Sequence, residues 1–84
     1  MKARLITPQG VAFENEVDEV YAPGASGQFG VLKDHTSFFT PLRKGDLKIR
    51  SGGKEIRYAI PGGFLEVYEN SITILVDEAR EVKG

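Results

Sequence analysis

Apolar and polar residues alternate along most of the chain. Leu47 and Ile49 flank Lys48, and residues 56–60 and 72–76 repeat the same period of two. This period is typical of strands that bury one face and expose the other. The pattern predicts nine strands, at Lys2–Thr7, Val11–Phe13, Val17–Ala22, Gln28–Leu32, Phe38–Leu42, Asp46–Arg50, Glu55–Ile60, Phe64–Tyr68 and Ser71–Val76.

The residues between these segments predict tight turns. Glycine and proline recur at short intervals, which leaves little uninterrupted length for a helix. Ser51–Lys54, with two central glycines, and the Glu69–Asn70 pair suit hairpin turns, because glycine and asparagine tolerate positive φ. We therefore expect neighbouring strands to be antiparallel and the chain to form an all-β sandwich or small barrel.

The last residues show a different pattern. Asp77–Lys83 is rich in helix formers, but it is too short to be a stable helix alone in water. With 84 residues in total, the chain has room for a single domain. We interpret residues 1–77 as a β-sandwich domain and residues 78–84 as a short tail.

Composition narrows the range of functions. The chain is 40% apolar and 27% charged, which is typical of a globular protein. It has no cysteine, which excludes thiolate chemistry, and its net charge of −1 gives no broad attraction to the phosphates of nucleic acid. Neither a signal peptide nor a run of roughly 20 apolar residues is present, so we expect a protein that neither crosses a membrane nor is exported.

Two segments raise the question of cofactor binding or catalysis. Gly24–Gly30 is dense in glycine, but it lacks the Gly-Lys-Ser/Thr ending of a P-loop and the spacing of a dinucleotide-binding turn. His35 is the only histidine, so a metal site there would depend on scattered carboxylates. We predict no catalytic residue, no cofactor and no metal site, and interpret His35 as part of a polar interface or a loop anchor.

A nucleic-acid-binding barrel is the main alternative function. Its support is a basic stretch interleaved with aromatic residues of the kind that stack on bases. These residues are Arg43, Lys44, Lys48, Arg50, Lys54 and Arg57, with Phe29, Phe38, Phe39, Tyr58 and Phe64. However, Lys48 and Arg50 alternate with apolar neighbours as on a solvated strand face, and Asp46 and Glu55 lie among the positive charges. We therefore favour a solvated face.

Two adjacent aromatic residues suggest an apolar outer surface. Phe38 and Phe39 cannot both point into one core from a single strand, so one of them, or Leu42, faces outward. Ala59 and Leu75 also lie opposite the strong core positions of their strands. These positions predict an apolar patch that binds another protein, with irregular strand geometry as the alternative.

The sequence resembles the epsilon subunit of F-type ATP synthases in several segments. These are Leu5–Phe13, Pro23–Gly24 continuing through Gly27–His35, and Tyr58–Val67, with further matches at Asn70, Thr73–Asp77 and Ala79. Each motif is modest alone, but all follow the order and spacing of the family over nearly the whole chain. The resemblance implies a flattened antiparallel β-sandwich of about ten short strands.

The resemblance also implies a role and two partners. The family member is a non-catalytic subunit of the central stalk, or rotor, which links the gamma subunit to the membrane c-ring and couples ion flow to ATP synthesis. Thr7, His35 and Thr40 match positions that face gamma, and we add Phe38 and Phe39 from the predicted patch. The loop Ser26, Gly27, Gln28 and Phe29 matches the one near the c-ring; the position of Gln28 is acidic in some relatives.

The implied location is the cytoplasmic side of a bacterial cell membrane, where the subunit associates peripherally through its complex. In the family this domain is normally followed by a C-terminal helical hairpin, which can inhibit rotation and in some members binds ATP. The present sequence ends at Gly84, so functions of the hairpin are not assigned to it.

Overall fold

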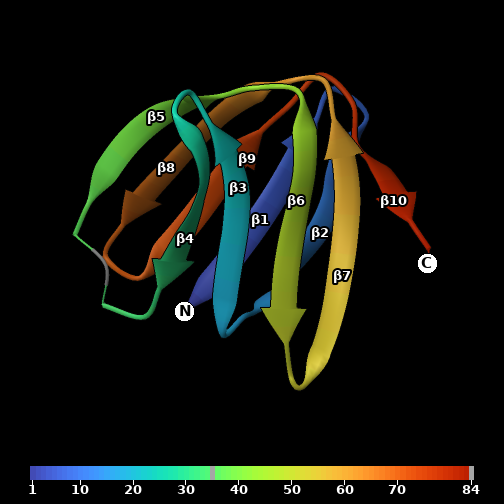
Figure 1. The fold of residues 1–84 in the computed structure, drawn as a ribbon. Coiled ribbons are helices and arrows are strands. Elements are labelled where there is room, and N and C mark those ends of the chain that lie inside the picture. Colours follow the sequence, from blue (N-terminus) through green and yellow to red (C-terminus); the bar gives the residue numbers. More distant parts are fainter. Residues whose placement is uncertain (35, 84) are drawn as a thin grey trace.

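The chain folds into two five-stranded sheets packed face to face, as Figure 1 shows. This computed structural model describes residues 1–34 and 36–83, and it contains ten strands and no helix in that part of the chain. Among the described residues no helix is long and apolar enough to cross a membrane. The predicted β-sandwich is therefore confirmed.

The first sheet, sheet A, contains strands from both ends of the chain. Its order is β2 (Gly10–Glu16), β1 (Lys2–Thr7), β9 (Ser71–Leu75), β8 (Gly63–Tyr68) and β5 (Phe38–Leu42). Sheet B has the order β10 (Arg80–Val82), β7 (Lys54–Ile60), β6 (Gly45–Ser51), β3 (Glu19–Gly24) and β4 (Gly27–Leu32). All nine predicted strands are present, with β2 longer and β3 starting two residues later than expected.

One pair of strands contradicts the expectation that neighbours are antiparallel. β1 and β9 run parallel, with Ala3 opposite Ile72 and Leu5 opposite Ile74. A hairpin turn forces only the two strands that it joins to be antiparallel, whereas β1 and β9 are separated by most of the chain. The remaining pairs are antiparallel, and both predicted hairpin turns form, with positive φ at Gly52, Gly53, Glu69 and Asn70.

The helix formers of Asp77–Lys83 do not form a helix. Residues 80–82 form β10, which pairs antiparallel with β7, with Arg80 opposite Ala59 and Val82 opposite Arg57. A short segment of helix formers gains little from its own hydrogen bonds, whereas the edge of sheet B offers backbone partners. Sheet B therefore extends to Val82.

The core lies between the sheets and consists of the inward residues of the alternating strands. Leu5, Leu47, Ile49, Leu65 and Ile74 have no exposed surface, and no polar residue among the described ones is buried. The other buried hydrophobic residues are Ala3, Val17, Val20, Ala22, Val31, Leu42, Tyr58, Ile60, Val67, Ile72 and Val76. Such a close-packed core resists deformation.

Aromatic pairs close the two open sides of the sandwich. Phe29 on β4 meets Phe38 on β5 edge to face, with ring centroids 6.0 Å apart, so the edge strands of both sheets are joined. On the opposite side Phe13 of β2 meets Tyr58 of β7 at 6.5 Å in a similar geometry. Edge-to-face pairs of this kind add about 0.5–1.5 kcal/mol beyond the apolar area they bury.

Candidate partner-binding face

A row of apolar residues crosses the outer face of sheet A near one end of the sandwich. The strand register places one residue of each strand side by side, in the order Val11, Ile6, Leu75, Phe64 and Pro41. Apart from Val11, each directly adjoins a buried residue in its own strand, so alternation turns its side chain outward. Val11, Phe64 and Leu75 are 56%, 47% and 46% exposed. We call these five residues the apolar row.

Phe39 extends the apolar row along β5. It pairs with Glu66 across the strands, which places it diagonal to Phe64, and the two rings stack with centroids 5.5 Å apart and planes 12° apart. Phe39 is also 63% exposed. Two rings already held together present a rigid apolar surface to a partner, because little side-chain freedom remains to be lost on binding.

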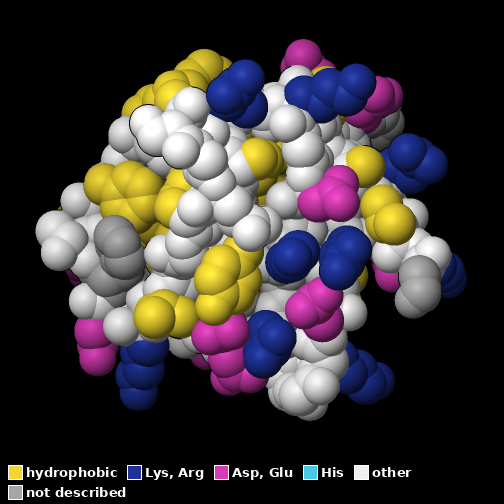
Figure 2. Space-filling model, in the orientation of Figure 1, with side chains coloured by type: hydrophobic (Ala, Val, Ile, Leu, Met, Phe, Trp, Pro, Cys, Tyr) yellow, Lys and Arg dark blue, Asp and Glu magenta, His cyan; other side chains and the backbone are white. Residues whose placement is uncertain are grey.

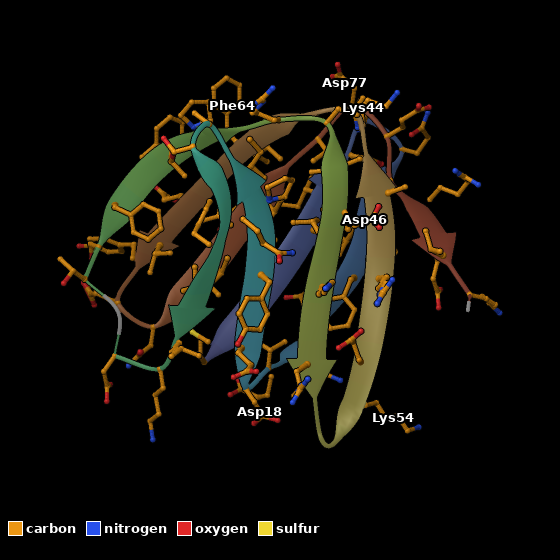
Figure 3. All side chains as sticks on the ribbon, in the orientation of Figure 1. Asp18, Lys44, Asp46, Lys54, Phe64 and Asp77 are labelled. Carbon is orange, nitrogen blue, oxygen red and sulfur yellow. The ribbon has the colours of Figure 1, made fainter. Side chains whose placement is uncertain are left out.

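A shallow hollow lies at the edge of the apolar row. It is lined by Pro41, Leu42, Pro61, Gly62, Gly63, Phe64, Leu75, Val76 and Asp77. Gly63 has φ +150°, and a Cβ there would collide with the carbonyl oxygen of Leu75, so only glycine allows the two strands to approach so closely. Phe64 and Asp77 lie at this end of the sandwich, away from Asp18 and Lys54 at the other end (Figure 3).

Charged residues border the apolar row on the same face. The neighbouring cross-strand positions are Arg4, Thr73 and Glu66. Arg4 Nε and Lys2 Nζ each lie 3.2 Å from Glu14 Oε2. The hydrogen bond from Lys2, assisted by Arg4, holds the pKa of Glu14 below its ordinary value. An apolar centre beside a polar rim is the usual arrangement of protein interfaces.

The outer face of sheet B has the opposite character. Arg50 lies 3.8 Å from Glu19 and 3.5 Å from Glu55, and Arg57 lies 3.2 Å from Glu55. The hydrogen bond from Arg57 lowers the pKa of Glu55, and the hydrogen bond that the Tyr21 hydroxyl donates to Glu19 raises the pKa of Tyr21. Figure 2 shows Lys and Arg side chains mixed with Asp and Glu across this face. It is a solvated face with compensated charges.

This arrangement does not support a nucleic-acid groove. The basic residues Lys48, Arg50 and Arg57 lie on the outer face of sheet B, whereas the stacked rings of Phe39 and Phe64 lie on sheet A. Among the other aromatic candidates Tyr58 is buried and Phe29 packs on Phe38. Single-strand binding needs aromatic rings and positive charge in the same groove.

The predicted gamma-facing residues are spread over several surfaces. Phe39 joins the apolar row, while Phe38 and Thr40 are half-buried on the other side of β5. Thr7 is the last residue of β1, at the turn into β2, where its Oγ1 accepts a hydrogen bond of 3.1 Å from the Gln9 backbone N–H, and it lines a shallow hollow with Val11. His35 lies outside the described residues.

The predicted c-ring-facing loop spans the turn between β3 and β4 and the first residues of β4. Ser26, Gly27 and Gln28 are exposed, whereas Phe29 is half-buried against Phe38. The hairpin is braced by Arg43, whose Nη1 donates to the carbonyl oxygen of Ala25 at 3.3 Å. The loop thus consists of an exposed tip, Ser26–Gln28, and one residue, Phe29, that packs against β5.

The sequence anticipated part of the apolar row. The alternation correctly predicted that Leu75 faces outward. Of the adjacent aromatic residues Phe39 faces outward, while Leu42 points into the core. Ala59 was wrongly grouped with Leu75, because it lies on β7 and faces outward from sheet B. Ile6, Val11, Pro41 and Phe64 were missed as members of the row, although the alternation of Phe64 with buried Leu65 could have indicated that Phe64 faces outward.

No group of three or more metal-ligating side chains occurs among residues 1–34 and 36–83. The family of the chain follows from its similarity to known proteins over nearly its whole length. Residues 1–82 match a family model described as the β-sandwich domain of the ATP synthase delta/epsilon chain. The chain is 43% identical over 76 residues to the ATP synthase epsilon chain of Desulforamulus reducens and 47% identical over 76 residues to that of an Anaeromyxobacter species.

These relatives are longer than the chain. Each alignment covers 90% of this chain and 58% of the relative, so the chain spans somewhat more than half of their length. A chain in the Euglena gracilis mitochondrial ATP synthase matches with a TM-score of 0.87 and 28% identity, covering 94% of this chain and 51% of that one. A chain in the Tetrahymena thermophila mitochondrial ATP synthase central stalk and c-ring matches the fold, with a TM-score of 0.79 and 19% identity over 94% of this chain and 64% of that one.

Proposed function

Because the chain belongs to the family of the ATP synthase delta/epsilon β-sandwich domain, we propose that it is a non-catalytic subunit of the central stalk of an F-type ATP synthase. In this role it links the gamma subunit to the membrane c-ring and couples ion flow to ATP synthesis. Relatives at 42–47% identity that are named ATP synthase epsilon chain support the proposal. So does the likeness to a chain in an assembly described as OSCP, F1 and c-ring.

The observation that carries the proposal is the difference between the two outer faces. Sheet A presents the apolar row and the stacked Phe39 and Phe64 rings, whereas sheet B presents paired charges. A sheet face with large exposed apolar residues in register is the expected form of a surface that another protein covers. We therefore assign the gamma contact to the apolar row.

The residues expected to face gamma lie on this surface or at its margins. Phe39 extends the apolar row on the edge strand β5 and Thr7 lies at the end beside Val11, while Phe38 and Thr40 lie on the other side of β5. His35 precedes β5 in the sequence and stays in the proposal on the resemblance alone. The buried core between the sheets suits a rotor part, which transmits torque only if it resists deformation.

The c-ring contact is assigned to the exposed tip of the β3–β4 hairpin. Ser26, Gly27 and Gln28 would meet the ring, and Phe29 would hold the tip through its contact with Phe38. Because Gln28 is uncharged, this contact would depend on hydrogen bonds more than on ion pairs. We place the subunit at the cytoplasmic side of a bacterial membrane, bound peripherally through its complex.

The test compares two substitutions of the same kind on opposite sheets. Leu75 of the apolar row is 46% exposed, and Leu32 on the outer face of sheet B is 50% exposed. Leu75→Lys places a charge in the proposed interface, and we expect it to weaken binding to purified gamma subunit at least tenfold, about 1.4 kcal/mol or more, in a titration calorimetry experiment. Leu32→Lys should bind within twofold of the unsubstituted chain.

Two results would overturn the assignment. If the unsubstituted chain does not form a complex with gamma on gel filtration, the central-stalk role fails. If Leu32→Lys weakens binding as much as Leu75→Lys does, gamma does not distinguish the two faces, and the apolar row is not its contact. Circular dichroism of both variants verifies that they remain folded.

A further inference from the structure

Three described residues other than glycine have positive φ, and all three meet at one joint. They are Asp34 at +65°, Glu69 at +46° and Asn70 at +62°. Asp34 lies between β4 and β5, while Glu69 and Asn70 form the turn between β8 and β9. The Asp34 backbone N–H donates a hydrogen bond of 3.1 Å to Asn70 Oδ1. Asn70 also accepts a backbone hydrogen bond of 3.0 Å from Lys2, so it connects three segments.

β5 depends on such connections more than the central strands do. It is the edge strand of sheet A and pairs with β8 on one side. The connection that precedes β5 crosses from sheet B to sheet A, as Figure 1 shows. After β5 the chain is fixed by the Arg43 backbone N–H, which donates to the carbonyl oxygen of Pro23 at 2.8 Å. At the other end the contact between Asp34 and Asn70 provides the corresponding anchor.

This strand also carries Pro41 of the apolar row and Phe39, which extends the row. Both lie on the outer side of the strand, and Phe39 stacks on Phe64 of the neighbouring strand. A shift at the start of β5 would change the distance between those two rings. The geometry of the partner-binding face is thus coupled to the joint at Asn70.

We propose that Asn70 is a positioning residue, whose side-chain amide holds the start of β5 and thereby sets the geometry of the apolar row. The role is separate from turn formation, for which a residue that tolerates positive φ is sufficient. The proposal rests on the proposed function only for the choice of gamma as the binding partner in one of its assays.

Two substitutions separate the two roles of Asn70. Asn70→Gly keeps a residue that accepts positive φ but removes the acceptor for the Asp34 N–H. Asn70→Asp keeps both an acceptor oxygen and a side chain that is tolerated at positive φ. Asn15→Ala is the control, because the Asn15 Oδ1 accepts a local hydrogen bond of 2.8 Å from the backbone N–H of Glu16 on β2, which lies at the opposite edge of sheet A from β5.

Amide hydrogen exchange measured by NMR tests how firmly β5 is held in the isolated chain, without any partner. We expect Asn70→Gly to speed exchange of the Asp34 amide about five- to tenfold, as the loss of one hydrogen bond predicts, and to speed exchange of the β5 amides that pair with β8. Core amides such as that of Leu47 on sheet B should keep their rates. Asn70→Asp and Asn15→Ala should both stay within twofold of the unsubstituted chain at Asp34 and in β5.

Binding to gamma supplies the second reading. Asn70→Gly should weaken the complex with gamma about threefold or more, and Asn70→Asp should restore the affinity of the unsubstituted chain. A general loss of stability would not produce this difference between the two variants. If Asp34 exchange is unchanged in Asn70→Gly, or if it rises while β5 exchange and gamma affinity stay constant, the positioning role is refuted. If the unsubstituted chain does not bind gamma, the central-stalk role fails, and the β5 exchange rates still decide the role of Asn70.

Discussion

Replacing Gly63 with alanine tests the close approach of β8 and β9 at the hollow beside the apolar row. An added Cβ would collide with the carbonyl oxygen of Leu75 and lie 2.8 Å from Val76 Cγ1, in a backbone conformation at φ +150° that L residues rarely adopt. The conformation alone costs about 1–3 kcal/mol. Relieving the overlap requires backbone shifts that typically cost another 1–3 kcal/mol. We expect a total loss of about 4 kcal/mol.

A matched control separates the two contributions. Gly10 has φ +126°, but an added Cβ there meets nothing within 4 Å, so Gly10→Ala should cost only the conformational part, about 1–3 kcal/mol. A domain of this size has a total unfolding free energy of roughly 4–12 kcal/mol, so Gly63→Ala should remove a third of it or more.

The assay for both variants is urea unfolding followed by far-ultraviolet circular dichroism. The free energy of unfolding is extrapolated to water for each variant. If the slope of this free energy against urea concentration is unchanged, the unfolded state is the same in both. If Gly63→Ala loses no more stability than Gly10→Ala, the backbone of Leu75 does not constrain this position, and the explanation of the glycine at position 63 is wrong.

Two further predictions concern the core and the polar rim. Leu65→Ala should lower the free energy of unfolding by about 2–5 kcal/mol in the same assay, because Leu65 is fully buried, and a loss below about 1 kcal/mol would contradict that burial. Because the pKa of Glu14 is lowered, its pairing with Lys2 favours the fold above the ordinary glutamate pKa of 4.5 and is lost as the pH falls through the lowered value. NMR titration should show the Glu14 pKa rising in Lys2→Met; an unchanged value would exclude Lys2 as the cause.

Alternation predicted most of the fold because most strands bury one face. Where both faces of a strand are exposed the signal is lost, and the polar residues 14–16 of β2 were therefore not recognised as strand. β10 was missed for a related reason. Its residues favour a helix in isolation, and only the free edge of β7 makes them a strand, which is a tertiary effect that no local window contains.

The candidate face could be predicted only one strand at a time. The outward direction of Leu75 follows from its own strand, but its position beside Ile6 depends on the parallel pairing of β1 with β9. That pairing joins segments at opposite ends of the chain, and no turn sequence encodes it. The error at Ala59 has the same origin, since alternation shows that a residue faces outward but not which sheet carries it.

The energy available from the apolar row limits how the proposed complex is held together. Full burial of a large apolar side chain gives about 1.5–3 kcal/mol, so covering the roughly half-exposed side chains of Val11, Phe39, Phe64 and Leu75 gives about 1 kcal/mol apiece, and Ile6, which is less exposed, gives less. The resulting total, on the order of 5 kcal/mol, only matches the lower estimates of the entropy lost on association. The rim around Arg4 and Glu66 must therefore contribute to binding gamma. In the proposed assembly the hairpin tip at Gln28 would also hold the subunit on the ring, which makes the gamma contact intramolecular and lets a modest interface suffice.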